Sequence, residues 1–155
     1  MKSCDKILIR RAAEQDLSGI LKIEEEAFVH PWSQESLEGL LSDRNSAVFT
    51  AVKDGTVCGY CGVNTVLDEG YITNIAVARQ YRRQGIAVAL LEELFDFAGE
   101  KPLSFLTLEV RKSNLNAINL YLKFGFKQVG ERKNYYSEPT ENAVLMTKYF
   151  KDGVV

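Results

Sequence analysis

The sequence has few cysteines, prolines and histidines, and it has no long apolar run. Its 155 residues include only 3 cysteines, 3 prolines and 1 histidine. So few cysteines do not make a disulfide framework, and they favour a reducing compartment. Residues 1–6 are charged and lack the apolar core of a secretory signal, and no apolar run approaches the ~20 residues that span a bilayer. We therefore expect a cytoplasmic protein with no membrane partner.

Charge of one sign is also scarce. The 19 lysines and arginines nearly balance 21 aspartates and glutamates, and a net charge of -2 gives no reason to expect direct binding of nucleic acid. A hydrophobic content of 46% is too high for a disordered chain. A chain of this length can bury a core without disulfides or metal, and no repeat or linker divides it. We expect a single domain over residues 1–155.

Hydrophobic spacing predicts a mixed α/β domain. Alternating or continuous short apolar runs indicate strands, whereas apolar residues three and four apart indicate helices. Strands are expected at residues 6–11, 47–53, 56–66, 71–77, 105–110, 126–132 and 143–149. Helices are expected at residues 17–28, 34–41, 87–98 and 115–123. The resulting order is β-αα-βββ-α-β-α-ββ, with residues 133–136 as an aromatic and polar loop.

Polar residues and glycines are expected to mark the ends of these elements. Asp16, Ser33 and Asn114 each offer a side-chain oxygen to the start of a helix. Gly125 stands where a helix commonly ends on a left-handed glycine. Residues 54–55, Asp-Gly, predict a tight hairpin turn.

A short basic loop before the third helix is the most informative stretch. It reads Arg82-Arg83-Gln84-Gly85, and the helix follows the glycine directly. The first turn of a helix has unpaired backbone amides and a partial positive charge, which together can hold a phosphate or pyrophosphate. Neither the Walker nor the Rossmann glycine pattern is present. From the loop alone, an anion site and an ordinary surface loop are equally good interpretations.

A carboxylate and a phenol form a second candidate pair. Glu109 lies near the end of the strand at residues 105–110, on the face opposite Leu108, and Tyr121 lies in the next helix. A partly buried carboxylate can act as a base, and a phenol beside a leaving group can donate a proton. Taken alone, the two residues better fit a solvated carboxylate paired with Arg111 and a core aromatic.

The Cys58-x-x-Cys61 pattern predicts neither a metal site nor a redox site. Residues three apart in a strand face opposite sides, so the two thiols should diverge. A structural zinc site needs four ligands, and only Cys4 and His30 could complete one. We expect two small strand residues, and we expect His30 to shape a loop rather than to act as a base.

The basic loop resembles the acetyl-CoA motif Gln/Arg-x-x-Gly-x-Gly/Ala of the GCN5-related N-acetyltransferase (GNAT) superfamily. Within it, the chain resembles the bacterial enzymes that acetylate the N-terminal alanine of ribosomal protein S18. The segments that carry this resemblance run in order along nearly the whole chain: His30-Pro31-Trp32-Ser33, Asn74-Ile75-Ala76-Val77, Leu108-Glu109-Val110-Arg111, Ser113-Asn114, Leu120-Tyr121, Phe124-Gly125-Phe126 and Arg132-Lys133-Asn134-Tyr135-Tyr136. The chain departs from the family at Ala78-Arg79, where an Asp/His-Pro pair is usual, and at Ala87, which replaces a glycine.

The resemblance implies a GNAT-like α/β fold, acetyl-CoA as cosubstrate and no metal. It implies that Glu109 is the general base and that Tyr121 is the general acid. The loops at residues 30–32 and 133–136 would rim a groove for the acceptor peptide. The residues that it assigns to acetyl-CoA binding are Ile75, Ala76, Val77, Arg83, Gln84, Gly85, Ile86, Ala87, Val88 and Asn114.

The implied activity is transfer of the acetyl group of acetyl-CoA to the N-terminal alanine amine of ribosomal protein S18. Two kinds of alternative stay open at this point. The same fold could acetylate other protein N-termini, lysine side chains or a small amine. A non-catalytic acetyl-CoA-binding protein is the alternative from another class, and the presence of both Glu109 and Tyr121 argues against it.

Overall fold

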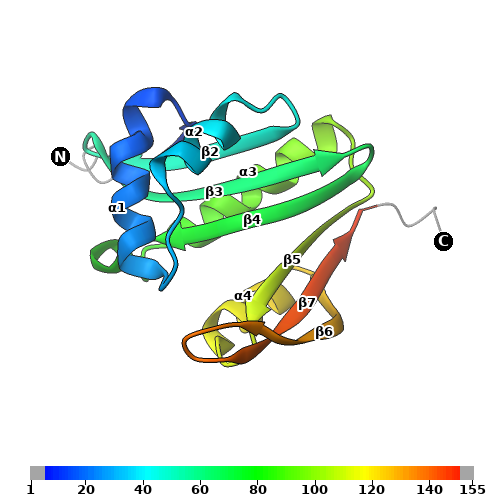
Figure 1. Cartoon of the computed structure of the whole chain (residues 1–155). Coiled ribbons are helices and arrows are strands. Elements are labelled where there is room, and N and C mark those ends of the chain that lie inside the picture. The colour runs from blue at the N-terminus through cyan, green and yellow to red at the C-terminus, as the bar shows by residue number, and fades with distance from the viewer. Residues whose placement is uncertain (1–5, 151–155) are drawn as a thin grey trace.

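A seven-stranded sheet runs through the computed structural model, which describes residues 6–150 (Figure 1). The strands lie in the order β1-β2-β3-β4-β5-β7-β6, and only β4 and β5 are parallel neighbours. Their bounds are β1 (Leu8–Arg11), β2 (Ser46–Lys53), β3 (Thr56–Val66), β4 (Glu69–Val77), β5 (Phe105–Arg111), β6 (Lys127–Tyr136) and β7 (Glu141–Tyr149). The predicted mixed α/β class and element order are confirmed.

Helices cover the two faces of the sheet unequally. Helices α1 (Leu17–Ala27) and α2 (Gln34–Ser42) pack on β2–β4 from one side, and α3 (Ile86–Glu100) packs on the other. Helix α4 (Leu115–Lys123) connects β5 to β6. The larger core lies under α3, and burial of each α3 leucine contributes about 1.5–3 kcal/mol. No helix within residues 6–150 is long and apolar enough to cross a bilayer.

Two helix starts and one helix end follow the expected chemistry. The Ser33 hydroxyl accepts a hydrogen bond from the Ser36 amide at 3.1 Å, and the Asn114 side chain accepts one from the Ala117 amide at 3.2 Å. Gly125 adopts φ +97°, the left-handed conformation expected after α4. These local predictions are confirmed.

Asp16 does not cap α1 as expected, although the helix begins directly after it. Its carboxylate accepts two hydrogen bonds from Arg10, at 2.7 and 2.9 Å, and one from the Ala13 amide at 2.8 Å. A bidentate guanidinium binds a carboxylate more strongly than a neutral amide does. The side chain is therefore drawn toward β1 and away from the helix end.

Several strand boundaries also differ from the prediction. Strand β4 begins at Glu69, two residues early, because its parallel pairing with β5 starts there. Strand β6 continues through Tyr136, although residues 133–136 were expected to form a loop. Its pairing with β7 is interrupted between Arg132 and Tyr136, where Asn134 has φ +52°. The segment is thus an irregular strand end that retains the turn-like backbone of a loop.

The expectation that the two strand cysteines point to opposite faces is wrong. The pairing of β3 with β2 shifts between Ala51 and Val52, which leaves Cys58 without an opposite residue. Such a bulge disturbs the alternation of side chains, and Cys58 and Cys61 both lie in the core under α3. Burial raises the pKa of both thiols. Within residues 6–150, no three His, Cys, Asp or Glu side chains are grouped to hold a metal ion.

The parallel pair β4–β5 is closed at one end and open at the other. Residues 69–71 pair with residues 105–107, and beyond them the two strands separate (Figure 1). Residues 72 and 74–77 of β4 keep their partners in β3, Thr73 is bulged out of that pairing, and none of residues 72–77 has a strand on its other edge. The separation therefore leaves an opening in the middle of the sheet.

Gly70 lies where β4 and β5 are still paired, and its lack of a side chain allows close packing at this end of the opening. A Cβ atom at this position would lie 2.7 Å from Leu106 Cδ2 and 2.8 Å from Leu103 Cδ1. Both leucines are buried. We predict that Gly70→Val lowers the free energy of unfolding by about 1–3 kcal/mol, as measured by urea denaturation, because the core has no room for the added carbons.

The matched control is Gly39→Ala on the exposed side of α2, where a Cβ atom would meet nothing within 4 Å. That substitution should leave stability unchanged or increase it, because alanine favours helix. Equal stability of Gly70→Val and the unsubstituted protein would show that the strands are not held together at this point.

Candidate active site

The separation of β4 and β5 opens a cavity of about 410 Å³ that passes through the sheet. Glu24 and Phe28 of the α1 region line it on one side of the sheet, and Ala117 and Tyr121 of α4 line it on the other. The strands supply its walls: Ile72, Thr73, Asn74 and Ile75 from β4, and Leu108, Glu109, Val110 and Arg111 from β5. The cavity is therefore lined by residues from both faces of the sheet.

Glu109 and Tyr121, the predicted base and acid, both line this cavity. The Tyr121 side chain is buried, and its ring lies 5.5 Å from that of Phe126 between centroids. Burial, with smaller contributions from Cys61 and Tyr136, raises the pKa of Tyr121 to about 12. The phenol is therefore neutral at physiological pH, so it can donate a hydrogen bond into the cavity.

The Glu109 carboxylate is held by two side chains of β6. Arg132 Nε donates to Glu109 Oε2 at 2.7 Å, and the Tyr135 hydroxyl donates to Glu109 Oε1 at 3.0 Å. A carboxylate has about four sites for hydrogen-bond donors, so it can still accept a proton or a hydrogen bond from another group. Sequence reasoning assigned neither Arg132 nor Tyr135 to this carboxylate.

Arg111 does not pair with Glu109, contrary to the alternative considered for that residue. Its guanidinium instead bonds Glu141 at 3.1 Å and the carbonyl oxygens of Ser137 and Pro139, each at 3.0 Å. It also lies 4.5 Å from the centre of the Tyr136 ring. Residues 107, 109 and 111 share a face of β5. Of these three, only Glu109 has its hydrogen-bond partners on β6.

The two segments expected to rim the acceptor groove lie together in the structure. His30 Nε2 lies 3.2 Å from Ser137 Oγ and 3.1 Å from Glu138 Oε1. His30, Tyr135 and Tyr136 all line the cavity. The turn after α1 and the turn between β6 and β7 therefore meet beside the cavity, and His30 has the loop-shaping contacts expected of it.

Glu24 is a buried carboxyl group of this cavity that sequence reasoning missed. Its oxygens accept hydrogen bonds from the Trp32 amide at 2.7 Å and from Asn74 Nδ2 at 2.8 Å, and Asn74 Nδ2 also donates to the Tyr60 hydroxyl at 3.0 Å. Burial raises the pKa of Glu24. The signal was present, because Glu24 falls seven residues after Leu17, on the apolar face of α1.

The loop before α3 has the backbone geometry of an anion site. Gly85 adopts φ +80°, and a Cβ atom there would meet nothing within 4 Å. No side chain caps α3, whose first backbone hydrogen bond from this loop joins the Ala89 amide to the Gly85 carbonyl. Arg83, also at positive φ, precedes this turn. The amides available to an anion are those of the predicted residues Ile86, Ala87 and Val88.

Side chains fasten the same loop to the sheet. Arg82 Nε donates to the Val77 carbonyl at 3.1 Å, which joins the loop to the end of β4. Gln84 Oε1 accepts a hydrogen bond from Lys53 Nζ of β2 at 3.0 Å. The Gln84 side chain is therefore bound to Lys53, and only the backbone of Gln84 is left to contact a ligand at this loop.

The remaining predicted residues are distributed along the opening. Ile75 lines the cavity, whereas the Ala76 side chain is buried on the α1 side of β4. Val77 packs on the α3 side, so only the backbones of Ala76 and Val77 are available along the free edge of β4. Asn114 caps α4 and also lines the cavity.

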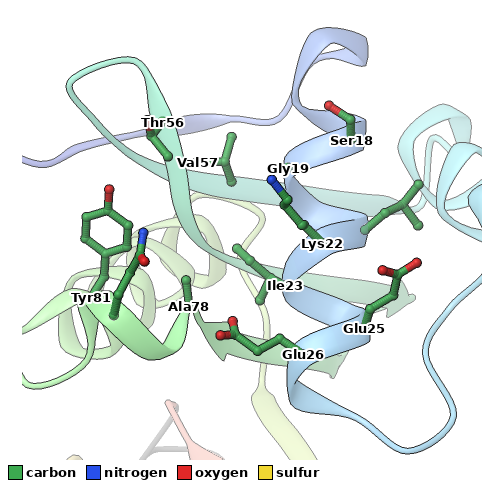
Figure 2. A pocket seen from close by; sticks show the side chains of 12 residues that line it. Ser18, Gly19, Lys22, Ile23, Glu25, Glu26, Thr56, Val57, Ala78 and Tyr81 are labelled. Carbon is green, nitrogen blue, oxygen red and sulfur yellow. The ribbon is translucent and has the colours of Figure 1, made fainter.

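A larger cavity, of about 650 Å³, lies elsewhere and contains none of these residues (Figure 2). It runs along α1 between the β2–β3 turn and residues 78–81. Lys22, Glu25 and Glu26 of α1 stand along it with Thr56 and Tyr81 opposite (Figure 2). Its charges have both signs, and Glu26 already accepts a hydrogen bond from the Arg79 amide at 3.2 Å. The convergence of polar groups, rather than volume, identifies the smaller cavity as the site.

Comparison with known proteins agrees with this geometry. The acetyltransferase (GNAT) family model matches residues 17–126. The bS18-alanine N-acetyltransferase of Escherichia coli K12 is 37% identical over 133 residues, which are 84% of this chain and 89% of that protein. The enzyme of the same name from Haemophilus ducreyi is 36% identical over 92% of this chain and 99% of its own length.

A solved structure gives the same result. The crystal structure of the ribosomal-protein-S18-alanine N-acetyltransferase from Escherichia coli superposes with a TM-score of 0.87. It is 34% identical in sequence and covers 93% of this chain and 94% of its own.

Glu24 gives a prediction for the pH dependence of stability. Its pKa in the folded protein lies above the ordinary value of 4.5. At a pH between these two pKa values, the carboxyl group is ionised in the unfolded chain and protonated in the folded protein, so folding takes up a proton. The contribution of Glu24 to the free energy of unfolding is greatest at a pH below its ordinary pKa. It is lost as the pH rises through the raised pKa of the folded protein. Glutamine carries no charge at any of these pH values. The melting temperature of the unsubstituted protein should therefore exceed that of Glu24→Gln most at about pH 4, and the difference should narrow toward pH ~8.

Thermal unfolding of both proteins from about pH 4 to about pH 8 checks this expectation. All other titrating groups are shared, so the difference between the two curves isolates Glu24. A constant difference, or one that widens as pH rises, would contradict the assignment of Glu24 as a carboxyl group that resists ionisation.

Proposed function

The chain belongs to the acetyltransferase (GNAT) family, and from this premise we propose that it transfers the acetyl group of acetyl-CoA to the N-terminal alanine of ribosomal protein bS18. The observation that carries the proposal is the pairing of Glu109 and Tyr121 across one cavity, in a chain 37% identical to an enzyme named for that reaction. A ribosomal substrate agrees with the cytoplasmic location expected from composition.

The chain's own residues suit acetyl-CoA. The free edge of β4 at residues 72–77 offers backbone donors and acceptors to an amide-bearing chain, as a strand would. The open space beside Gly85 and the uncapped first turn of α3 suit a pyrophosphate. Acetyl-CoA bound in this way would present its thioester carbonyl carbon to the amine, and its sulfur would leave with the electron pair.

Glu109 removes one proton from the acceptor amine as the amine nitrogen forms the new bond to the acetyl carbon. An α-amine has an ordinary pKa of ~7.7–8.0, so about a tenth of it is already neutral at pH 7. A lysine amine, at ~10.4, would need about 3.5 kcal/mol more for the same deprotonation. One carboxylate therefore suffices for an N-terminal amine, which favours a protein N-terminus as acceptor.

Tyr121 assists departure of the sulfur by a hydrogen bond rather than by complete proton transfer. Its pKa of about 12 exceeds that of an ordinary thiol, ~8.5, by roughly 3.5 pKa units. Full transfer to a free thiolate would be uphill by about 5 kcal/mol. A fixed neutral phenol still stabilises charge as it develops on sulfur.

The proposal is tested with three acceptors and purified protein. An alanine-starting peptide with the N-terminal sequence of S18, a lysine peptide with a blocked N-terminus, and a polyamine are each incubated with acetyl-CoA. We expect free thiol to appear fastest with the first, and mass spectrometry to place the acetyl group on the alanine nitrogen. Faster acetylation of lysine or polyamine would assign a different acceptor, and no thiol release with any acceptor would refute catalysis.

Tyr121→Phe tests the phenol. The ring and its packing remain, so binding of acetyl-CoA should change little while the stabilisation of developing charge is lost. We predict that kcat falls by about 10²-fold and that the KM for acetyl-CoA changes far less. An unchanged kcat in the purified variant would exclude this role.

Glu109→Gln tests the carboxylate. Glutamine keeps the size of the side chain but cannot accept a proton at neutral pH. We predict that kcat/KM falls and that the acidic limb of its pH profile becomes less steep, because only the acceptor amine, with an ordinary pKa of ~7.7–8.0, then titrates there. A variant whose acidic limb had the same slope as that of the unsubstituted protein would clear Glu109 of the role of base.

A further inference from the structure

A bulge interrupts β6 beside the active-site cavity. Pairing with β7 stops at Arg132, opposite Ala143, and resumes at Tyr136, opposite Glu141. Three residues of β6, 133–135, therefore lie opposite one residue of β7. A bulge of this kind bends its strand and changes the direction in which the neighbouring side chains point.

Asn142 is the single β7 residue opposite the bulge, and its side chain binds β6 at two points. Asn142 Oδ1 accepts a hydrogen bond from the Asn134 amide at 2.9 Å, and Asn142 Nδ2 donates to Glu131 Oε2 at 2.7 Å. Lys112 Nζ donates to the same Glu131 oxygen at 3.0 Å. Asn134 has φ +52°, which is uncommon for residues other than glycine. A side chain, rather than the strand ladder, therefore holds this backbone in its irregular conformation.

The bulge brings Arg132 and Tyr135 to the same carboxylate. In a regular strand, residues three apart lie about 10 Å from each other along the strand and face opposite sides. Here Arg132 Nε donates to one oxygen of Glu109 at 2.7 Å, and the Tyr135 hydroxyl donates to the other at 3.0 Å. The Arg132 guanidinium also lies 5.9 Å from the centre of the Tyr135 ring. A regular β6 could offer Glu109 only one of these two donors.

We propose that the β6 bulge orients the Glu109 carboxylate for its role as base, with Arg132 and Tyr135 as positioning residues and Asn142 as the residue that holds the bulge. The inference rests on the proposed function, because it takes Glu109 to be the group that receives the proton. One donor on each oxygen fixes the plane of the carboxylate and leaves a lone pair on each oxygen for the acceptor amine. In this role Arg132, Tyr135 and Asn142 act only through Glu109.

Orientation matters at this position because β5 fixes only the backbone of Glu109. A glutamate side chain has three rotatable bonds, so without partners its carboxylate has no single position. A misplacement of about 1 Å at a reacting group can lower a rate by about 10²-fold. Side chains that lock the rotamer of a catalytic group therefore affect the rate without touching the reacting atoms.

Double-substitution cycles test whether these residues act through Glu109. Tyr135→Phe, Arg132→Met and Asn142→Ala are each made alone and together with Glu109→Gln, and kcat and KM are measured with acetyl-CoA and the alanine-starting S18 peptide. For each single variant we expect kcat to fall about ten- to hundredfold, and the KM for acetyl-CoA to change by less than about twofold.

The same substitutions should change kcat by less than about twofold when Glu109 is already glutamine. Orienting a group that can no longer take the proton gives no advantage. A structural effect on the fold, or direct contact of Tyr135 with the acceptor, predicts a different result, because either would lower activity by the same factor with and without Glu109.

Two matched control variants accompany the cycles. Tyr149→Phe removes the hydroxyl of another exposed tyrosine, on β7, and Lys127→Met removes an exposed cation from the first position of β6. Both should leave kcat and KM unchanged. Arg132 and Tyr135 are themselves exposed, so their variants should fold, and an unchanged KM for acetyl-CoA verifies this for each preparation.

The outcomes distinguish this inference from the proposed function. No acetyl transfer by the unsubstituted protein would refute the function, and an unchanged kcat in Glu109→Gln would refute the assignment of the base. If Glu109→Gln is impaired, an unchanged kcat in Tyr135→Phe and Arg132→Met, or an equal fall in both backgrounds, would overturn the positioning inference while the function stands. An unchanged kcat in Asn142→Ala alone would overturn the role of Asn142.

Discussion

The limited pairing of β4 with β5 is the constraint on which the site depends. Three residues on each strand pair in parallel, and the strands then separate while β4 remains paired with β3 except at a bulge at Thr73. Backbone N–H and C=O groups in a folded protein need partners. The fold therefore leaves a row of such groups along residues 72–77 to be satisfied from outside the chain, in the middle of its sheet. A ligand with amide groups of its own is the natural complement of this edge.

The two carboxyl groups of the cavity differ because their surroundings differ. Glu24 is buried under α1 and receives hydrogen bonds only from uncharged groups, so its charged form is disfavoured. Glu109 has a guanidinium and a phenol as partners. The first joins α1, the turn at Trp32 and β4 into one wall. The second is left with free lone pairs at the centre of the cavity.

Much of the fold followed from local patterns, because helix periodicity, strand alternation and capping residues act over a few positions. Ser33, Asn114 and Gly125 behave as their local chemistry requires. The errors arose where a distant partner decides. Asp16 turns toward Arg10, the bulge at Cys58 depends on β2, and the extra strand at residues 133–136 depends on β7.

The candidate site shows the same division. The positions of Glu109 and Tyr121 could be expected from the sequence, and the structure places both beside one cavity. Arg132 and Tyr135 could not be assigned to Glu109, because β6 meets β5 only through β7 in the sheet order and no short-range pattern records that approach. Glu24 was detectable as a charged residue on an apolar helical face, whereas its link to Asn74 spans fifty positions of the chain.

An opening that passes through a sheet has two mouths. Here residues of α4 line the cavity on one face of the sheet and residues of α1 line it on the other, which would let a donor and an acceptor approach from opposite faces. The two cysteines of the described residues are enclosed under α3 and are not among the residues that line the cavity. The architecture thus allows two ligands to occupy the opening at once, each reached from a different face of the sheet.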